Sequence, residues 1–421
     1  MTIESILELQ KESRSSYVYF AAALLFLHNT GLGGCFVYGG LTLFHHREEG
    51  GGEEERFFLY LTEDQGSNYM SIVPLLNLFG SILGYPAAEY FGRKPTLIVT
   101  NIIQIVGFII IYLSNNFLLL MLGRCLTCFA IGLGVMVPFV LISEITTIKQ
   151  RAPFSVINTQ SISYGILSSF LFVYFFPTKY LIFFTSGQSL LFLLLSVFLP
   201  ESPHFLIKKN KVQVAEKVYK KLRGKEYAGI TDEVNEVIEL IKNQNSQTDN
   251  HQSRWTRRNF LQPLLILMFL MFFISLNGVD CPLNFYGPSM FKEFGFTISP
   301  DLISCLIPLG QLLGYILAPF IMSLISKKTQ YLLACVIMIL SSCCLVLSYY
   351  AKSISFQPIG AQQAGLAVGS LGLTFGYGVG FGAVSYAMPG DILLPSDKTI
   401  GISIAQCVRM IGTTLIIKVR T

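Results

Sequence analysis

Apolar runs of about 20 residues recur along almost the whole chain, and they restrict its fold more than any other feature. A helix with a rise of ~1.5 Å per residue crosses a bilayer in a run of this length. Only 13% of the residues are charged, whereas a soluble domain usually carries about 25%. The runs lack the two-residue alternation of barrel strands, so we expect an all-α membrane protein. Eleven spans are predicted, near residues 18–40, 69–88, 95–113, 117–142, 153–175, 180–199, 260–283, 299–324, 330–350, 362–388 and 399–417.

The distribution of lysine and arginine predicts the side of the membrane on which each loop lies. The first 16 residues are polar and the first apolar run is too long for a signal peptide, so we expect no cleaved leader. With the N-terminus in the cytoplasm, 21 lysines and arginines fall in cytoplasmic segments and five in outer loops. Cytoplasmic loops carry such an excess of positive residues. The net charge of +5 therefore indicates orientation in a membrane and not nucleic-acid binding.

The sequence lacks the usual markers of an enzyme or a metal site. Its nine cysteines lie in or beside apolar runs, and the CxxC of Cys125 and Cys128 has no second pair or histidine beside it. The five histidines have no metal-ligand spacing. No nucleophile elbow, phosphate loop or acid pair is present. We therefore expect no catalysis, metal or cofactor, and we interpret the cysteines as buried packing residues.

One long polar stretch divides the chain. We predict a first bundle of six spans over 1–203, a cytoplasmic linker over 204–258 and a second bundle of five spans over 259–421. Within the linker, KVQVAEKVYKKLRG and TDEVNEVIELIKN have helical periodicity with charged outer faces. The linker is either a solvated connector or a gate element that braces the bundles, and the sequence favours neither.

A charged motif, an acid followed by a base seven residues later, occurs once in each half. EITTIKQR runs from Glu144 to Arg151 and DILLPSDK from Asp391 to Lys398, each at the end of a long apolar run. GRK, at 92–94, and SKK, at 326–328, also occupy equivalent loops if the second half repeats the first. Parallel duplication about an axis along the membrane normal is a known transporter design. It predicts two pseudo-symmetric bundles with all four motifs on the cytoplasmic face.

These motifs resemble the sugar-porter branch of the major facilitator superfamily over residues 17 to 418. The most specific match is PESPHFL, Pro200 to Leu206, which is similar to the family's PESPRFL after span 6. LGRCLTCFAIGLGVMVPFVLISEITTIKQRA matches the span 4 pattern with Arg124, Gly132, Gly134, Glu144 and Arg151. GFGAVSYAMPGDILLPSDK matches the span 10 pattern with Gly380, Gly382, Asp391, Pro395 and Lys398. Within the branch the chain looks closest to the facilitated trehalose and glucose transporter type.

The chain also departs from the family pattern. The family's Asp-Arg before Gly-Arg-Lys is Glu89-Tyr90 here, and its second Gly-Arg-Arg is Ser326-Lys327-Lys328. The Gln-Gln of span 7 is replaced by Ile274-Ser275, and the span 10 Trp by Tyr386. The family has twelve spans, and we count eleven here, so we expect either an incomplete sequence or a divergent paralogue.

The resemblance implies that the loop charges act as a cytoplasmic gate. In the family such charges tie the two bundles together while the central cavity faces outward. An exposed ion pair contributes only ~0–1 kcal/mol, but a partly buried network can set a two-state equilibrium. The alternative is that the charges only enforce topology. The expected gate residues are Arg93, Glu144, Arg151, Asp391 and Lys398.

A sugar site needs amides, hydroxyls and aromatic faces in a confined cavity. Gln311 matches a position where the family places an amide in span 8, and Tyr386 replaces the family's Trp. Asn277, Asp280 and Asn284 are spaced i, i+3 and i+7, which would place them on one face of a helical span 7. Each candidate could instead serve helix packing. The expected substrate-binding residues are Gln311, Asn277, Asp280, Asn284, Thr159, Gln160 and Tyr386.

The resemblance implies facilitated transport of a hexose or trehalose by a monomer in the plasma membrane. Proton-coupled relatives carry an acid in span 1, and YFAAALLFLHNTGLGGCFVYGG has none. Asp280 keeps a proton-coupled symporter open as an alternative. The departures from the pattern also keep open a non-transporting sugar sensor, a degenerate paralogue, or a carrier of another small solute. The sequence does not explain the acidic, glycine-rich outer loop at 45–56.

Overall fold

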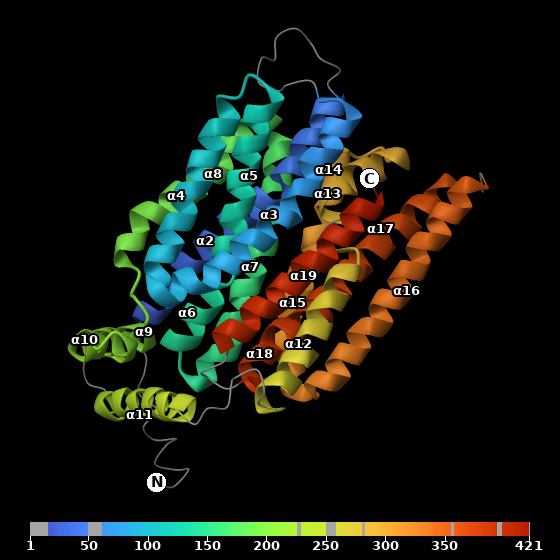
Figure 1. The fold of residues 1–421 in the computed structure, drawn as a ribbon. Helices are drawn as coiled ribbons and strands as arrows, with labels where there is room; N and C mark the ends of the chain where they lie inside the picture. The colour runs from blue at the N-terminus through green and yellow to red at the C-terminus, as the bar shows by residue number, and fades with distance from the viewer. Residues whose placement is uncertain are drawn as a thin grey trace.

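The structure, a computed structural model, describes residues 16–48, 61–224, 229–249, 258–279, 283–354, 358–393 and 398–420. Throughout these segments the regular elements are helices, and no strand occurs in them. The helices form two bundles that lie side by side, blue to green and yellow to red in Figure 1.

The helices of the first bundle alternate in direction across the molecule (Figure 1). Its helices are α2 (Ser16–Glu48), α3 (Glu63–Tyr90), α4 (Arg93–Tyr112), α5 (Phe117–Gly134), α6 (Val137–Ile145), α7 (Ile148–Phe175), η2 (Thr178–Tyr180), α8 (Leu181–Leu195) and η3 (Ser196–Phe198). The next segment holds α9 (Pro203–Lys208), α10 (Val212–Arg223) and α11 (Ile230–Asp249). These three short helices lie at one end of the first bundle (Figure 1) and share a small apolar core around Ala215, Tyr219 and Val234.

The second bundle follows the same alternation with more interruptions. Its helices are α12 (Arg258–Leu276), α13 (Asn284–Glu293), α14 (Pro300–Ser304), α15 (Leu306–Leu324), α16 (Lys327–Ser353), α17 (Ile359–Gly376), the π-helix η6 (Tyr377–Phe381), α18 (Gly382–Ile392) and α19 (Lys398–Arg420). The bundles meet where α2 contacts α13, α3 contacts α19 and α7 contacts α15. The helices that carry Glu144 and Asp391 therefore end on the same face of the molecule (Figure 1).

The predicted spans coincide with helices. In the described part of the chain, nine helical stretches are long and apolar enough to cross a membrane, and each overlaps a predicted span. The two other predicted spans, 260–283 and 399–417, overlap the shorter apolar helices Phe260–Leu276 and Ile400–Leu415. Large apolar side chains such as Leu118, Leu324 and Val346 are exposed on the outer faces. The chain is thus an all-α, multi-pass membrane protein.

Glycines set the distance between crossing helices in both bundles. At the α3–α5 crossing, Gly80 and Gly132 touch, and a Cβ on Gly132 would overlap the carbonyl oxygen of Asn77. In the second bundle Gly314 of α15 meets Gly378 of η6 in the same way. Both crossings join the second and fourth spans of their bundle, as expected if one bundle repeats the other.

We predict that Gly132→Leu disrupts the first bundle. The added side chain has no space against Asn77, and overpacking of a filled core costs roughly 1–3 kcal/mol or more. Thermal unfolding of the detergent-purified protein should shift to lower temperature. Gly187→Leu on α8, where a Cβ meets open space, is the matched control. Equal melting temperatures for the two variants would contradict the tight crossing.

Candidate functional site

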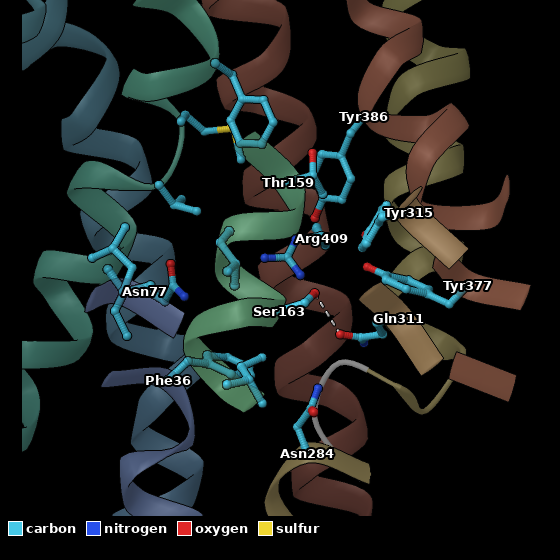
Figure 2. Close-up of a pocket in the computed structure, with 17 residues that line it drawn as sticks. Phe36, Asn77, Thr159, Ser163, Asn284, Gln311, Tyr315, Tyr377, Tyr386 and Arg409 are labelled. Carbon is cyan, nitrogen blue, oxygen red and sulfur yellow. Dashed lines mark hydrogen bonds between the residues drawn. The ribbon is translucent and has the colours of Figure 1, made fainter. Parts of the chain in front are cut away.

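A pocket lies between the two bundles near the middle of the spans. The cavity that its lining residues enclose has a volume of about 80 Å³, which is smaller than the ~300–1,000 Å³ of typical small-molecule sites. Polar and aromatic side chains from both bundles point toward it (Figure 2). The first bundle contributes Leu32, Phe36, Asn77, Ile131, Val135, Met136, Phe139, Thr159, Ile162, Ser163 and Ile166. The second contributes Asn284, Gln311, Tyr315, Tyr377, Tyr386 and Arg409.

A hydrogen bond across the pocket joins the two bundles. The Ser163 hydroxyl of α7 donates to Oε1 of Gln311 on α15 at 2.9 Å (Figure 2). Both side chains are buried, and a buried amide or hydroxyl needs such a partner. The amide predicted in span 8 therefore lines the pocket, and the serine opposite it is an addition from the structure.

Three tyrosines give the second-bundle side of the pocket its aromatic surface. Tyr315 and Tyr377 are buried and meet edge to face, with ring centroids 6.3 Å apart. Tyr386 stacks on Phe139 of the first bundle at 5.8 Å, with an interplanar angle of 12°. Aromatic faces of this kind can pack against the C–H surfaces of a sugar ring. The predicted replacement for the family's Trp thus lies at the pocket.

Span 7 is not one continuous helix, so the expected common face of its polar residues does not form. α12 ends at Leu276, and Gly278 adopts a φ of +81°, a conformation that favours glycine. Asn284 begins α13 and lines the pocket, whereas Asn277 lines a different groove on the outer face with Phe273 and Leu276. The placement of Asn277 beside Asn284 was wrong because it assumed unbroken helical spacing. Asp280 lies outside the described residues.

The two candidates in span 5 separate because neighbouring residues on a helix point about 100° apart. Thr159 lines the pocket, and its hydroxyl donates to the carbonyl of Ser155 one turn earlier at 3.1 Å. Gln160 is half-buried and is not among the lining residues.

Five pocket residues with polar atoms in their side chains were not predicted from the sequence: Asn77, Ser163, Arg409, Tyr315 and Tyr377. Asn77 is buried on α3, and its side-chain oxygen has no hydrogen-bond partner within the described residues. Arg409 lies inside the last apolar helix, and an isolated cation there is a recognised functional signal. Tyr315 and Tyr377 carry no signal that separates them from ordinary core aromatics.

A second arginine, Arg124, is enclosed within the first bundle. Its Nη1 donates to the carbonyl of Cys35 on α2 at 3.1 Å, and its guanidinium lies 5.4 Å from the centroid of the Tyr69 ring. Nε and Nη2 have no hydrogen-bond partner among the described residues. The described partners of Arg124 are thus a carbonyl and an aromatic ring, and none is a carboxylate.

An ion-pair network lies at the end of the first bundle beside α9 and α10. Arg93 makes a two-pronged pair with Glu144, from Nη2 to Oε1 at 2.8 Å and from Nε to Oε2 at 3.0 Å. Nη2 also donates to Glu89 at 2.9 Å, and Glu89 accepts from Lys208. The side chains of Arg93 and Glu144 are only 5% and 10% exposed, so removal of one charge would leave the other buried.

The ion pairs of this network lie within the first half of the chain. Within the described part of the chain, no ion pair joins Glu144 to Arg151, because Arg93 of α4 occupies the carboxylate. Arg151 lies in the first turn of α7, where burial and the nearby Arg223 lower its pKa. The described ion pairs of this network join parts of the first bundle and α9, and none crosses to the second bundle. The side chains of Asp391 and Lys398 lie outside the described residues.

The PESPHFL motif fixes α9 against this network. Ser202 caps α9 by accepting from the Phe205 N–H at 3.1 Å, and Pro203 is its first residue. Glu201 accepts from the N–H of Arg93 at 3.0 Å and so places a negative charge at the start of α4. Burial lowers the pKa of His204 below 6.5, with partial opposition from Glu144. Burial thus favours the neutral form of the His204 imidazole.

Comparisons with known proteins assign the family. A model of the family described as "Sugar (and other) transporter" matches residues 16–419. The "Facilitated trehalose transporter Tret1" of Apis mellifera ligustica is 25% identical over 359 residues, which cover 85% of this chain and 71% of that protein. The "Facilitated trehalose transporter Tret1-2 homolog" of Drosophila sechellia is 28% identical over 335 residues, which cover 79% and 68%.

A solved structure with the same fold is the major facilitator superfamily proton:xylose symporter XylE bound to 6-bromo-6-deoxy-D-glucose. It aligns with a TM-score of 0.78 over 96% of this chain and 88% of that one, at 17% identity. The predicted major facilitator fold is therefore confirmed. Because the family model covers nearly the whole chain, the chain belongs to the sugar transporter family, whose members are membrane transporters and not enzymes.

Proposed function

We propose that this chain carries a hexose or trehalose across the plasma membrane by facilitated diffusion. The observation that supports this most is the pocket between the bundles, bridged by Ser163 and Gln311. Donors, acceptors and aromatic faces there come from both bundles, so a relative movement of the bundles would assemble and separate the site. The names of the relatives favour trehalose, and the protein with the similar fold is a xylose symporter with a bound glucose derivative.

Sugar recognition would use the polar residues that face the pocket. Gln311 and Asn284 offer amides, Thr159 a hydroxyl, and Tyr386 an aromatic face with a polar edge. The hydrogen bonds that a sugar forms in the pocket replace those that it gives up to water. The net affinity can therefore stay modest. Gln160, Asn277 and Asp280 remain predictions that the pocket does not support directly.

Transport without a proton is favoured by the surroundings of Arg124. The neighbouring position on α2 is Cys35, and no carboxylate bonds to Arg124 among the described residues. Without an acid beside Arg124, the described surroundings of this arginine contain no carboxyl group that could take up a proton during transport. Asp280 would supply one in the alternative symport mechanism.

The moving units would be the bundles at 1–203 and 259–421, connected by the linker at 204–258. The lysine-rich helix α10, its neighbour α9 and the start of α2 lie at the same end of the molecule (Figure 1), which favours a cytoplasmic N-terminus. Both halves of the pocket come from one chain, which is compatible with a monomer.

The ion-pair network would serve as the cytoplasmic gate. Arg93 and Glu144 stiffen the end of the first bundle, which would then close against the loop that carries Asp391 and Lys398. Arg151, in the first turn of α7, would take part in that contact. The gate would hold the inner side shut until substrate binding shifts the equilibrium between the two states.

We predict that the protein equilibrates labelled glucose or trehalose across liposome membranes without concentrating it. Uptake should be unchanged by a protonophore and vary little with pH, because no proton is carried. The measurement is the time course and final level of uptake in liposomes of the purified protein. Accumulation that collapses with the proton gradient, and that Asp280→Asn abolishes, would support the symporter. Binding without flux would indicate a sensor.

We predict that Gln311→Ala raises KM for the transported sugar. A hydrogen bond contributes about 0.5–1.5 kcal/mol, which corresponds to a roughly 2- to 10-fold rise. Ser163→Ala should have a smaller effect, because it removes the partner that orients Gln311. Ser168→Ala is the control, since its hydroxyl bonds to the Gly165 carbonyl of its own helix. An unchanged KM in Gln311→Ala would remove this residue from the site.

We predict that Arg93→Gln and Glu144→Gln each lower both thermal stability and transport rate. Loss of one partner of a buried ion pair costs about 3–5 kcal/mol because it leaves the other charge uncompensated. A double variant that exchanges the two charges, Arg93→Glu with Glu144→Arg, should recover part of the lost stability and transport rate. Lys352→Gln is the control, since Lys352 pairs with the exposed Glu293. A gate role requires that transport fall more than the amount of folded protein does.

A further inference from the structure

The pocket contains a charge that a neutral sugar does not require. Among the described residues that line it, Arg409 is the one with a charged side chain. It lies on α19, and Figure 2 shows its guanidinium in view between Thr159 and Ser163 of α7. A cation at this depth in a membrane is costly and usually serves a function.

Arg409 is held from two sides. The Ser275 hydroxyl of α12 donates to the Arg409 carbonyl at 2.6 Å, which ties this turn of α19 to α12. The Nε of Arg409 donates to Oε1 of Gln406, a buried residue one turn earlier, at 3.1 Å. The guanidinium is therefore positioned before a substrate arrives, which reduces the entropy lost on binding.

The remaining chemistry of the pocket suits a sugar with an acidic group. Gln311, Asn284 and the tyrosines can serve hydroxyls, while a guanidinium matches the geometry of carboxylate and phosphate oxygens. A guanidinium has five N–H donors, so its bonds to protein acceptors are compatible with a further contact to substrate. Apolar walls such as Ile131, Val135 and Ile162 strengthen the effect of a charge on the ligand.

We propose that the pocket binds acidic sugars, which carry a carboxylate or phosphate group, in preference to neutral ones, and that Arg409 contacts that group. This inference rests on the proposed sugar transport and specifies the substrate class of the same site. It makes Arg409 a determinant of specificity by charge: an anionic sugar gains an attractive contact, a neutral one gains little, and a cationic one is repelled.

The test compares sugars that share one ring and differ in charge. Inhibition of labelled glucose uptake into liposomes is measured at pH 6.5 with D-glucuronate, unlabelled D-glucose, D-glucosamine and glucose 6-phosphate. We expect glucuronate or the phosphate to inhibit about tenfold more strongly than glucose, as one charge-assisted hydrogen bond would give. Glucosamine should inhibit less than glucose. Whichever of the two anions inhibits more strongly identifies the acidic group.

Variants assign the effect to this residue. Arg409→Gln should remove the preference for anions while neutral glucose still competes, and Arg409→Lys should keep the preference. Lys352→Gln removes a positive charge far from the pocket and should leave the order of inhibitors unchanged. The inference is overturned if glucose inhibits the wild-type protein as strongly as both anions, or if Arg409→Gln keeps the preference.

Failure of transport itself is distinguishable. If no labelled sugar enters the liposomes, the proposed function fails, and the preference is then measured as thermal stabilisation of the detergent-purified protein by each sugar. Greater stabilisation by an anion in the wild type but not in Arg409→Gln would support the inference, and equal stabilisation would contradict it.

Discussion

The structure depends on one constraint: polar groups buried within apolar helices must find partners, because the surrounding lipid offers none. Within the first bundle several buried side chains meet this constraint with partners on neighbouring helices. Asn101 hydrogen-bonds His28 at 2.8 Å, Asn29 reaches Asn158 at 2.7 Å, and Gln104 donates to the Gly31 carbonyl at 3.0 Å. These residues lock neighbouring helices together and do not line the pocket.

Between the bundles the same constraint is met differently. Gln311 reaches across to Ser163, so its partner belongs to the bundle that would move relative to it in the proposed transport. A polar group whose protein partner departs needs another partner, which water or a substrate hydroxyl can supply. This difference separates a structural amide such as Gln104 from one that can bind substrate, although the two look alike in the sequence.

Much of the fold could be predicted from the apolar runs, whereas most of the predicted site residues came from the family resemblance. Run length and hydropathy located the spans because each helix must satisfy its backbone within the membrane. Gln311, Asn284, Thr159 and Tyr386 were predicted and line the pocket. Asn277 was misplaced, because the turn at Gly278 cannot be read from helical spacing. The partner of Glu144 was also missed, since the contact with Arg93 depends on how three helices pack.

The interruptions of the helices explain why the pocket lies where it does. Three spans break near it: between α5 and α6, between α12 and α13, and at η6. Broken backbone is tolerated at membrane depth where it is buried in protein or lines a cavity, and π-helical turns often occur at functional sites.

Each of these breaks supplies lining residues: Val135 and Met136 at the first, Asn284 at the second, and Tyr377 at the third. The third break joins α17 to α18, which carries Tyr386 against Phe139 of the opposite bundle. A change of angle at η6 would therefore move a pocket tyrosine and the contact between the bundles together. Substrate contact and closure can thus be coupled through one helix, without a separate pathway between them.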